Sequence, residues 1–277
     1  MSRTLEESIR ARLATHGFAI RRAVRLSDRG SSPVFRVETM SGRTFKLRTF
    51  ASASAAHAVF QPLAAAEDGV LPRPLARFGR VLLTEFVDGP TVAHLWPRAT
   101  AWDRRALLRA TARLAQRLHE LPAAGAPVRP VSAYPRIIAR AARALLRRAF
   151  LDLETSRRLI AFEAPVGTRS ALTHADICPD NLIQQSPGCL RLIDEERLAV
   201  RPIAFDLARA VARWPLEPAS EREFLNTYRA AGGDVAGFRD DRHFWLAAAF
   251  STSVLYRLRR GDTRVRPLAE QLEQLRK

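Results

Sequence analysis

Three side chains that could carry out chemistry lie close together in the sequence, two carboxylic acids and an amide, at Asp176, Asn181 and Asp194. Strand-like runs at 182–185 and 190–193, separated by a Ser-Pro-Gly-Cys turn, predict an antiparallel hairpin. If the first residue of one run pairs with the last residue of the other, Asn181 lies opposite Asp194 at the open end of the hairpin. Asp176 is then one loop away, so we expect the three side chains to converge.

This combination of groups is the one that phosphoryl transfer needs. Carboxylate and amide oxygens are hard ligands that suit Mg2+, and a separate carboxylate can orient an attacking hydroxyl and accept its proton. We therefore expect Asn181 and Asp194 to bind magnesium and Asp176 to act on the hydroxyl. His174 is expected to hold the loop in place by hydrogen bonding rather than to react.

Lys46 is notable because nearly every other basic residue is an arginine, and only Lys277 is a second lysine. Its neighbours, Phe45 and Leu47, are typical of a strand. A lysine kept in such a chain indicates a site that needs a compact ammonium group where a forked guanidinium does not fit. The alternative is that Lys46 is retained by chance.

The chain carries a formal net charge of +17, which favours contact with polyanions such as an anionic lipid surface. A compositional bias toward alanine and arginine accounts for much of this excess equally well. The arginines of an expected helix at 134–149 share one side, which is either a solvated face or a binding surface. Contact with a polyanion or a membrane surface stays open, whereas nucleic acid is not expected as a partner.

The composition also limits where the protein works and how it is held together. No run of eighteen uncharged apolar residues occurs, and the charged first twelve residues do not resemble a signal peptide. We therefore expect a cytoplasmic protein in which Cys178 and Cys189 form no disulfide. The 277 residues and 47% apolar content are enough for one large domain or two lobes.

The elements that must position these residues change character along the chain. After an expected helix at 3–16, the segment 19–50 is rich in β-branched and aromatic residues, and another strand is expected at 81–86. Asp88-Gly89-Pro90 has strong turn chemistry and marks the expected boundary. The sequence thus predicts an α+β, bilobal fold, with a small β-rich lobe at 1–88 and a larger, mostly helical lobe at 89–277. Helices are expected at about 52–66, 101–121, 134–149, 153–163, 203–213, 219–231 and 241–260.

The order of these motifs resembles the aminoglycoside phosphotransferase and choline kinase family, which shares the protein-kinase fold. The resemblance covers most of the chain, and no single match is specific on its own. Only about a dozen residues separate Asp194 from Asp206, too few for the activation segment of a protein kinase, so a small-molecule acceptor is favoured. The matching segments are His174-x-Asp176 with Asn181, Leu192-Ile193-Asp194, Phe205-Asp206-Leu207-Ala208, Ser31-Ser32-Pro33-Val34-Phe35-Arg36-Val37, Lys46, Glu85-Phe86-Val87-Asp88-Gly89 and Leu118-His119-Glu120-Leu121-Pro122.

The resemblance implies ATP and Mg2+ as cofactors and a hydroxyl of a small molecule as the acceptor. It implies that Lys46 holds the α- and β-phosphates and that backbone groups of Glu85 and Val87 meet the adenine. Asp206 would brace the catalytic loop without touching the substrate. The nucleotide loop would include Gly30, Ser31 and Ser32.

Three positions depart from the family pattern. Ala175 replaces a glycine between the histidine and the aspartate, which is harmful if that residue has a positive φ. Glu195 stands where an aromatic residue commonly follows the metal-binding aspartate. The helix after Lys46 offers His57 near the place where a glutamate would pair with the lysine, and Glu67 is too far along. On this basis Lys46 lacks its usual anchor.

Three functions are compatible with these observations. The first is a kinase that moves the γ-phosphate of ATP to a sugar, amino alcohol, other metabolite or antibiotic. The second is a nucleotide-binding pseudokinase, and the third is a kinase or adaptor at a polyanionic surface such as lipopolysaccharide. The high positive charge argues against a polycationic acceptor, but an acidic group at Glu217, Glu221 and Glu223 keeps a cationic acceptor open.

Overall fold

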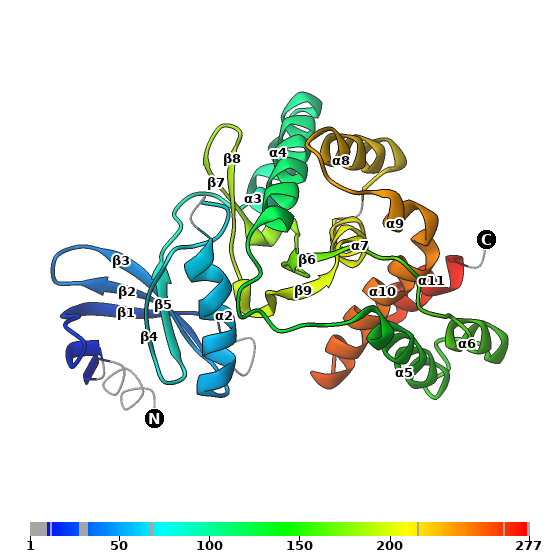
Figure 1. Cartoon of the computed structure of the whole chain (residues 1–277), viewed down its shortest axis with the longest axis horizontal. Helices are drawn as coiled ribbons and strands as arrows, with labels where there is room; N and C mark the ends of the chain where they lie inside the picture. Colours follow the sequence, from blue (N-terminus) through cyan, green and yellow to red (C-terminus); the bar gives the residue numbers. More distant parts are fainter. Residues whose placement is uncertain are drawn as a thin grey trace.

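The computed structural model describes residues 10–11, 13–27, 33–66, 69–214, 216–262 and 264–275. It has an antiparallel sheet at the N-terminal end and a larger, mainly helical part after it, which lie side by side (Figure 1). The expected α+β class, with a small β-rich part followed by a larger, mainly helical part, is confirmed. Most of the helix expected at 3–16 lies outside the described residues.

The N-terminal sheet has five strands, all paired antiparallel, in the order β1-β2-β3-β5-β4. Along β2 and β3 the apolar side chains largely alternate with polar ones, so that Phe35, Val37, Phe45 and Leu47 pack on one face in a small core. β4 was not expected, because it begins at a proline and reads as a loop in the sequence. The strands are β1 (Ile20–Ser27), β2 (Val34–Thr39), β3 (Thr44–Thr49), β4 (Pro74–Phe78) and β5 (Val81–Glu85).

Helix α2 (Ala53–Ala65) joins the sheet to the rest of the molecule. It begins at Ser52, whose side chain accepts a hydrogen bond from the amide of Ala55. Its buried residues Val59 and Leu63 belong to the large core that also contains helices of the C-terminal part. The two parts therefore share apolar packing rather than meeting only through polar groups.

The connection after β5 is fixed to a hairpin of strands β7 (Leu182–Ser186) and β8 (Cys189–Leu192). The amide of Gln184 donates to the carbonyl of Pro90 at 3.0 Å. Gly89 has φ +138°, and a Cβ atom there would lie 2.3 Å from the backbone oxygen of Gln184. Only glycine allows this close approach, so the turn chemistry expected at this point has a structural role. The lobe boundary itself stays a prediction.

The helical part is built around two long helices. α4 (Ala101–Glu120) begins with a capping box between Thr100 and Asp103 and packs on α8, while α10 (Arg242–Arg259) packs on α5 and α7. The expected helices are present, and five short elements were missed: β6 (Ser170–Thr173), β9 (Ala199–Pro202), α3 (Val92–Leu95), α9 (Ala236–Asp240) and α11 (Arg266–Gln274). The other helices are α5 (Tyr134–Leu146), α6 (Leu153–Ile160), α7 (Ile203–Arg213) and α8 (Pro218–Ala230).

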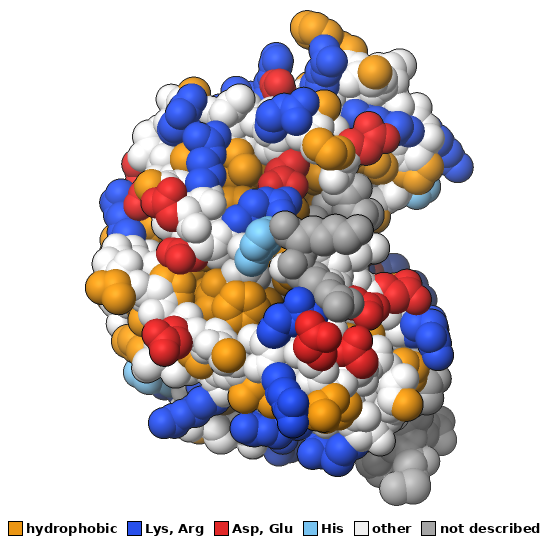
Figure 2. Space-filling view, turned by 90° about the vertical axis from the view of Figure 1, so that its right-hand side faces the viewer, with side chains coloured by type: hydrophobic (Ala, Val, Ile, Leu, Met, Phe, Trp, Pro, Cys, Tyr) orange, Lys and Arg blue, Asp and Glu red, His pale blue; other side chains and the backbone are white. Residues whose placement is uncertain are grey.

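The basic residues are not gathered into one patch on the face of the molecule that Figure 2 shows. In the space-filling view, Lys and Arg side chains are distributed across the face shown, with acidic side chains between them (Figure 2). On α5, the arginines Arg136, Arg140 and Arg143 are exposed along one side, as the spacing predicts. Whether that side binds a polyanion stays a prediction. Within the described ranges, no helix has the length and apolar character needed to span a membrane.

Candidate active site

The hairpin β7–β8 forms as expected, but its register differs by one residue. At the turn, Ser186 pairs with Cys189, which agrees with the expected register. A bulge between Gln184 and Ser186 then inserts one extra residue, so that Leu182 pairs with Leu192 rather than with residue 193. The two cysteines are both free, as expected.

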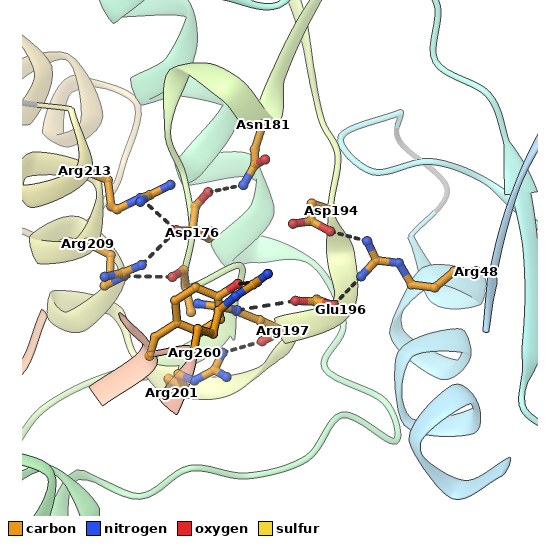
Figure 3. A network of polar contacts seen from close by, with 12 residues as sticks. Arg48, Asp176, Asn181, Asp194, Glu196, Arg197, Arg201, Arg209, Arg213 and Arg260 are labelled. Carbon is orange, nitrogen blue, oxygen red and sulfur yellow. Dashed lines mark hydrogen bonds and ion pairs between the residues drawn. The ribbon is translucent and has the colours of Figure 1, made fainter. Parts of the chain in front are cut away.

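Despite the shifted register, the hairpin brings the three expected side chains into one region (Figure 3). The carbonyl of Asn181 accepts a hydrogen bond from the amide of Ile193 at 2.9 Å. Asn181 Nδ2 donates to the carbonyl of Asp176, also at 2.9 Å, which leaves the amide oxygen for another partner. Asp194 follows directly with a left-handed backbone (φ +69°), and its side chain is 36% exposed.

The loop that carries Asp176 rests on a buried polar network. Asp206, near the start of α7, accepts hydrogen bonds from the amides of His174 at 3.0 Å and Ala175 at 2.6 Å. Behind it, His119 Nε2 contacts Asp206 at 3.1 Å and His119 Nδ1 contacts the hydroxyl of Tyr228 at 2.7 Å. Burial alone would raise the pKa of Asp206, but hydrogen bonding to His119 keeps that pKa below its usual value.

His174 differs from its expected role. Its side chain is completely buried, and within the described residues neither ring nitrogen has a hydrogen-bond partner. The backbone amide of His174, rather than the ring, makes the hydrogen bond that ties the loop to Asp206. The hydrogen-bonded brace is therefore His119, which the sequence offered only as part of a helix-end motif.

Asp176 lies beside two arginines of α7. Its Oδ1 atom is 2.8 Å from Arg209 Nη2 and 3.2 Å from Arg213 Nε. Burial would raise the pKa of Asp176, but the positive charges of Arg209 and Arg213 lower it overall. The carboxylate is therefore ionised at neutral pH. Neither arginine was singled out from the sequence, because arginines in a helix of such an arginine-rich chain carry no distinguishing signal.

Lys46 has a partner that the sequence did not predict. Its Nζ atom lies 2.6 Å from Oε2 of Glu195, and the Glu195 side chain is completely buried. Burial would raise the pKa of this acid, but the positive charge of Lys46, with a smaller contribution from Arg48, holds the pKa of Glu195 at about 2. Arg48 is two residues after Lys46 in β3 and so lies on the same side of the strand, and it contacts both Asp194 and Glu196. The strand and the loop after Asp194 are thus joined by charged pairs.

Comparisons with known proteins identify the family of this chain. A family model described as "Phosphotransferase enzyme family" matches residues 22–244. The chain belongs to this phosphotransferase family. A search of the curated proteins found no match.

Solved structures share the fold of this phosphotransferase over nearly the whole chain. Macrolide 2'-phosphotransferase MphH from Brachybacterium faecium has a TM-score of 0.68 at 17% identity, with 96% of each chain covered. Choline kinase LicA from Streptococcus pneumoniae has a TM-score of 0.66 at 14% identity, covering 97% of this chain and 98% of that one. APH(2")-IIia, in its complex with GDP and kanamycin, has a TM-score of 0.71 at 15% identity, with 98% of each chain covered.

The nucleotide-binding residues expected for the phosphotransferase are only partly in view. Gly30, Ser31 and Ser32 lie outside the described residues. Glu85 ends β5, and its amide donates to the carbonyl of Arg73 at 2.9 Å, so this amide is not free for a base. Val87 follows in the extended connection and is partly exposed. The contacts of Glu85 and Val87 with adenine stay predictions.

The anchor of Lys46 shows how two departures of this phosphotransferase compensate for each other. Helix α2 has no acidic residue, so the lysine has no glutamate partner there. His57 is exposed on α2 and contacts Gln61 instead. The acid is supplied by Glu195, at the position after Asp194. The expectation that Lys46 lacks an anchor was therefore wrong, and an acid directly after Asp194 was the signal that could have located it.

Ala175 does have the strained conformation that would make the loss of glycine harmful. Its φ is +61°, in the left-handed region, and it is almost completely buried. The hydrogen bond from its amide to Asp206 and the one from Arg209 Nε to its carbonyl, at 3.0 Å, hold it there. The phosphotransferase thus keeps the left-handed backbone at position 175 through these hydrogen bonds rather than through a glycine.

The donor set around Asp194 fits magnesium better than a softer metal. The available ligands are the carboxylate of Asp194 and the side-chain oxygen of Asn181, and Mg2+ commonly takes one or two protein oxygens together with waters and phosphate oxygens. Among the described residues no three His, Cys, Asp or Glu side chains cluster as a zinc-type site would require. Two open hollows of about 420 and 280 Å³ near α6 and α10 include none of the residues discussed above.

We expect Glu195→Gln to weaken ATP use by this phosphotransferase, because Lys46 loses the charge that holds it. The KM for ATP should rise by about tenfold, and stability should fall by about 3 kcal/mol, the cost of breaking a buried ion pair from one side. His57→Gln, on the exposed side of α2, is the matched control and should leave both values unchanged. Equal KM values for wild type and Glu195→Gln would contradict this role.

The same variant should change the response to acid. With a pKa of about 2 in the folded state against an ordinary 4.5, Glu195 contributes stability that is complete above about pH 4.5 and is lost as the pH falls toward 2. The difference in Tm between wild type and Glu195→Gln should therefore be largest near neutral pH and shrink below pH 4.5. Thermal unfolding followed across this pH range measures it, and a difference independent of pH would argue against the pair.

Ala175→Gly should stabilise the protein without loss of activity. Glycine adopts the left-handed conformation without strain, and the gain, offset by the extra freedom of the unfolded chain, should be up to about 1 kcal/mol. Ala106→Gly, at an exposed position inside α4, is the control and should instead destabilise by about 1 kcal/mol. Chemical denaturation compares the two variants. A loss of stability at position 175 equal to that at position 106 would refute the strain.

Proposed function

We propose that this phosphotransferase transfers the γ-phosphate of ATP, in a magnesium-dependent reaction, to a hydroxyl group of a small molecule. The observation that carries the proposal is the convergence of Asp176, Asn181 and Asp194 beside an anchored Lys46. A pseudokinase is disfavoured because the acid expected to be missing is supplied by Glu195 at 2.6 Å from Lys46. The reaction is proposed for the cytoplasm, where ATP is available.

Each side chain has one task in the proposed reaction. Lys46 binds the α- and β-phosphates, and Glu195 keeps its ammonium group in place. Asn181 and Asp194 hold Mg2+, which would neutralise charge on the phosphates. Because Arg48 contacts the same carboxylate of Asp194, a metal there would share Asp194 with Arg48 or leave Arg48 to Glu196 alone.

Asp176 orients the attacking hydroxyl and receives its proton. Its lowered pKa makes it a weak base, so proton removal before attack is not its main contribution. In phosphoryl transfer the bond to the leaving group is largely broken before the proton must go, so orientation matters more than basicity. The proton passes to the Asp176 carboxylate as the new oxygen–phosphorus bond forms.

The nucleotide is proposed to lie between the sheet and the hairpin. Gly30, Ser31 and Ser32 would cover its phosphates, and the backbone of Glu85 and Val87 would meet its base. Structures with the same fold include one bound to GDP and kanamycin and others named as a macrolide 2'-phosphotransferase and a choline kinase. These support a small hydroxylated acceptor, and the acceptor of this chain is addressed below.

Asp176→Asn should reduce turnover by about a hundredfold or more while Mg-ATP still binds, because the change removes proton acceptance and positioning but leaves the metal ligands. Steady-state ATP consumption against a panel of sugars, amino sugars, amino alcohols, nucleosides and aminoglycosides gives turnover, and calorimetry gives binding. Asp180→Asn, an exposed neighbour in the same loop, is the control and should retain wild-type turnover. Full activity of Asp176→Asn would rule out the proposed role.

Asp194→Ala should act on Mg-ATP binding instead. Loss of a metal ligand should weaken Mg-ATP by about tenfold or more, with little effect on ATP titrated in the presence of a chelator. Calorimetry with and without magnesium separates the two. Unchanged affinity for Mg-ATP would show that Asp194 does not hold the metal.

A further inference from the structure

The arginines near Asp176 are arranged on the side of the site away from the N-terminal sheet. In the close-up view, Arg48 approaches Asp194 from the sheet, whereas Arg209 and Arg213 approach Asp176 from α7 on the opposite side (Figure 3). Arg48 and Lys46 belong to β3, on the side proposed for the nucleotide. The α7 side is therefore the side from which an acceptor would reach Asp176.

The two arginines of α7 are not equivalent. Arg209 is buried, and besides Asp176 it donates to the carbonyls of Ala175 and Ala249 and to the hydroxyl of Ser253. Its hydrogen-bonding capacity is largely used within the protein. The Arg213 side chain is 37% exposed, and among the described residues its polar partners are Asp176 and, more weakly at 3.6 Å, the sulfur of Cys178. Arg213 therefore has N–H donors left for a ligand.

A second pair of arginines lies on the same side. Arg197 stacks on the ring of Tyr256 at 4.9 Å, and Arg260 stacks on it at 5.5 Å. Arg260 also donates to the Tyr256 hydroxyl at 2.6 Å, so the three side chains form one unit. The positive charge of Arg197 is close enough to Asp176 to help lower the pKa of Asp176.

The carboxylates near these arginines are already engaged by other cations. Asp176 is held by buried Arg209, and Glu196 is held by buried Arg48, with Arg197 at a longer 3.7 Å from Glu196. Arg213 and Arg197 are thus partly exposed guanidinium groups with positive charge that these pairs do not cancel. Guanidinium groups bind phosphate and carboxylate with two hydrogen bonds in a fixed geometry, which makes them suited to an anionic ligand.

Two members of the acidic group at Glu217, Glu221 and Glu223, which kept a cationic acceptor open, are already paired with arginines. Glu221 makes a two-point ion pair with Arg242, which donates from Nε to Oε1 at 3.2 Å and from Nη2 to Oε2 at 2.9 Å. Glu223 contacts Arg109 of α4. Two of its three acids are therefore used to hold helices together.

We propose that the acceptor of this phosphotransferase is a hydroxylated small molecule that carries a phosphate or carboxylate group, which Arg213 and Arg197 bind while the hydroxyl faces Asp176. The proposal rests on the function proposed above and specifies its substrate class. A free small molecule is favoured over a membrane or polymer surface because the two arginines lie on either side of Asp176, the one carboxylate proposed to meet the hydroxyl. A membrane or polymer would instead need basic residues spread along an extended face.

The deciding experiment compares acceptors that differ only in charge. Wild-type protein, saturated with a non-hydrolysable ATP analogue and Mg2+, is titrated by calorimetry with glucose 6-phosphate, glucose and glucosamine, and with glycerol 3-phosphate and glycerol. The phosphate esters should bind at least tenfold more tightly than their neutral and amino counterparts. Arg213→Gln should remove most of this difference, whereas Arg140→Gln, on the exposed side of α5, should leave it unchanged.

Several results would overturn the proposal. The first is that the amino sugar binds more strongly than the phosphate ester. The second is that all the compounds bind equally or that none of them binds. The third is that Arg213→Gln loses as much affinity for ATP as for the phosphate esters. Binding to anionic vesicles but to none of the small molecules would point to a surface as the acceptor and would also overturn the proposal. Failure of the ATP analogue to bind would instead contradict the proposed function, so the two failures are distinguishable.

Discussion

The buried ion pair between Lys46 and Glu195 is the interaction on which the rest of the site depends. It joins the middle strand of the N-terminal sheet to the loop that follows Asp194. A buried charge without a partner is strongly unfavourable, so each member of the pair requires the other to be in place. The pair therefore fixes where Lys46, proposed to bind phosphate, lies relative to Asp194, proposed to bind the metal.

The loop that carries Asp176 depends on a different kind of constraint. Asp206 holds the two amides before Asp176, and His119 and Tyr228 hold Asp206 from behind. These groups come from α4, α7 and α8, so the position of Asp176 is set by helix packing rather than by the loop itself. The left-handed backbone of Ala175 is maintained at some cost by the same hydrogen bonds.

Much of the fold could be predicted from local sequence patterns. The helix at 203–213 and the hairpin turn at 187–188 are found where periodicity and turn chemistry placed them. The strands β6 and β9 have only four residues each, too few for periodicity to show. The one-residue shift of the hairpin register arises from a bulge, which depends on how β7 packs and leaves no local signal.

The candidate site was predictable in its residues but not in their partners. Asp176, Asn181 and Asp194 lie in one short segment, and a hairpin is enough to bring them together. Glu195 is 149 positions from Lys46, so their pairing depends on the tertiary fold. The sequence showed that an acid was missing from α2 and that another followed Asp194, but not that this second acid meets the lysine. Arg209 and Arg213 could not be distinguished among 45 lysines and arginines before their contacts with Asp176 were known.

The most direct test of this account is a double-mutant cycle for Mg-ATP affinity with Lys46→Met, Glu195→Gln and the double variant. If Glu195 acts on the nucleotide only through Lys46, the double variant should bind Mg-ATP no more weakly than Lys46→Met alone. If the losses of the two single variants add in the double variant, Glu195 does not act through Lys46, and the account is contradicted.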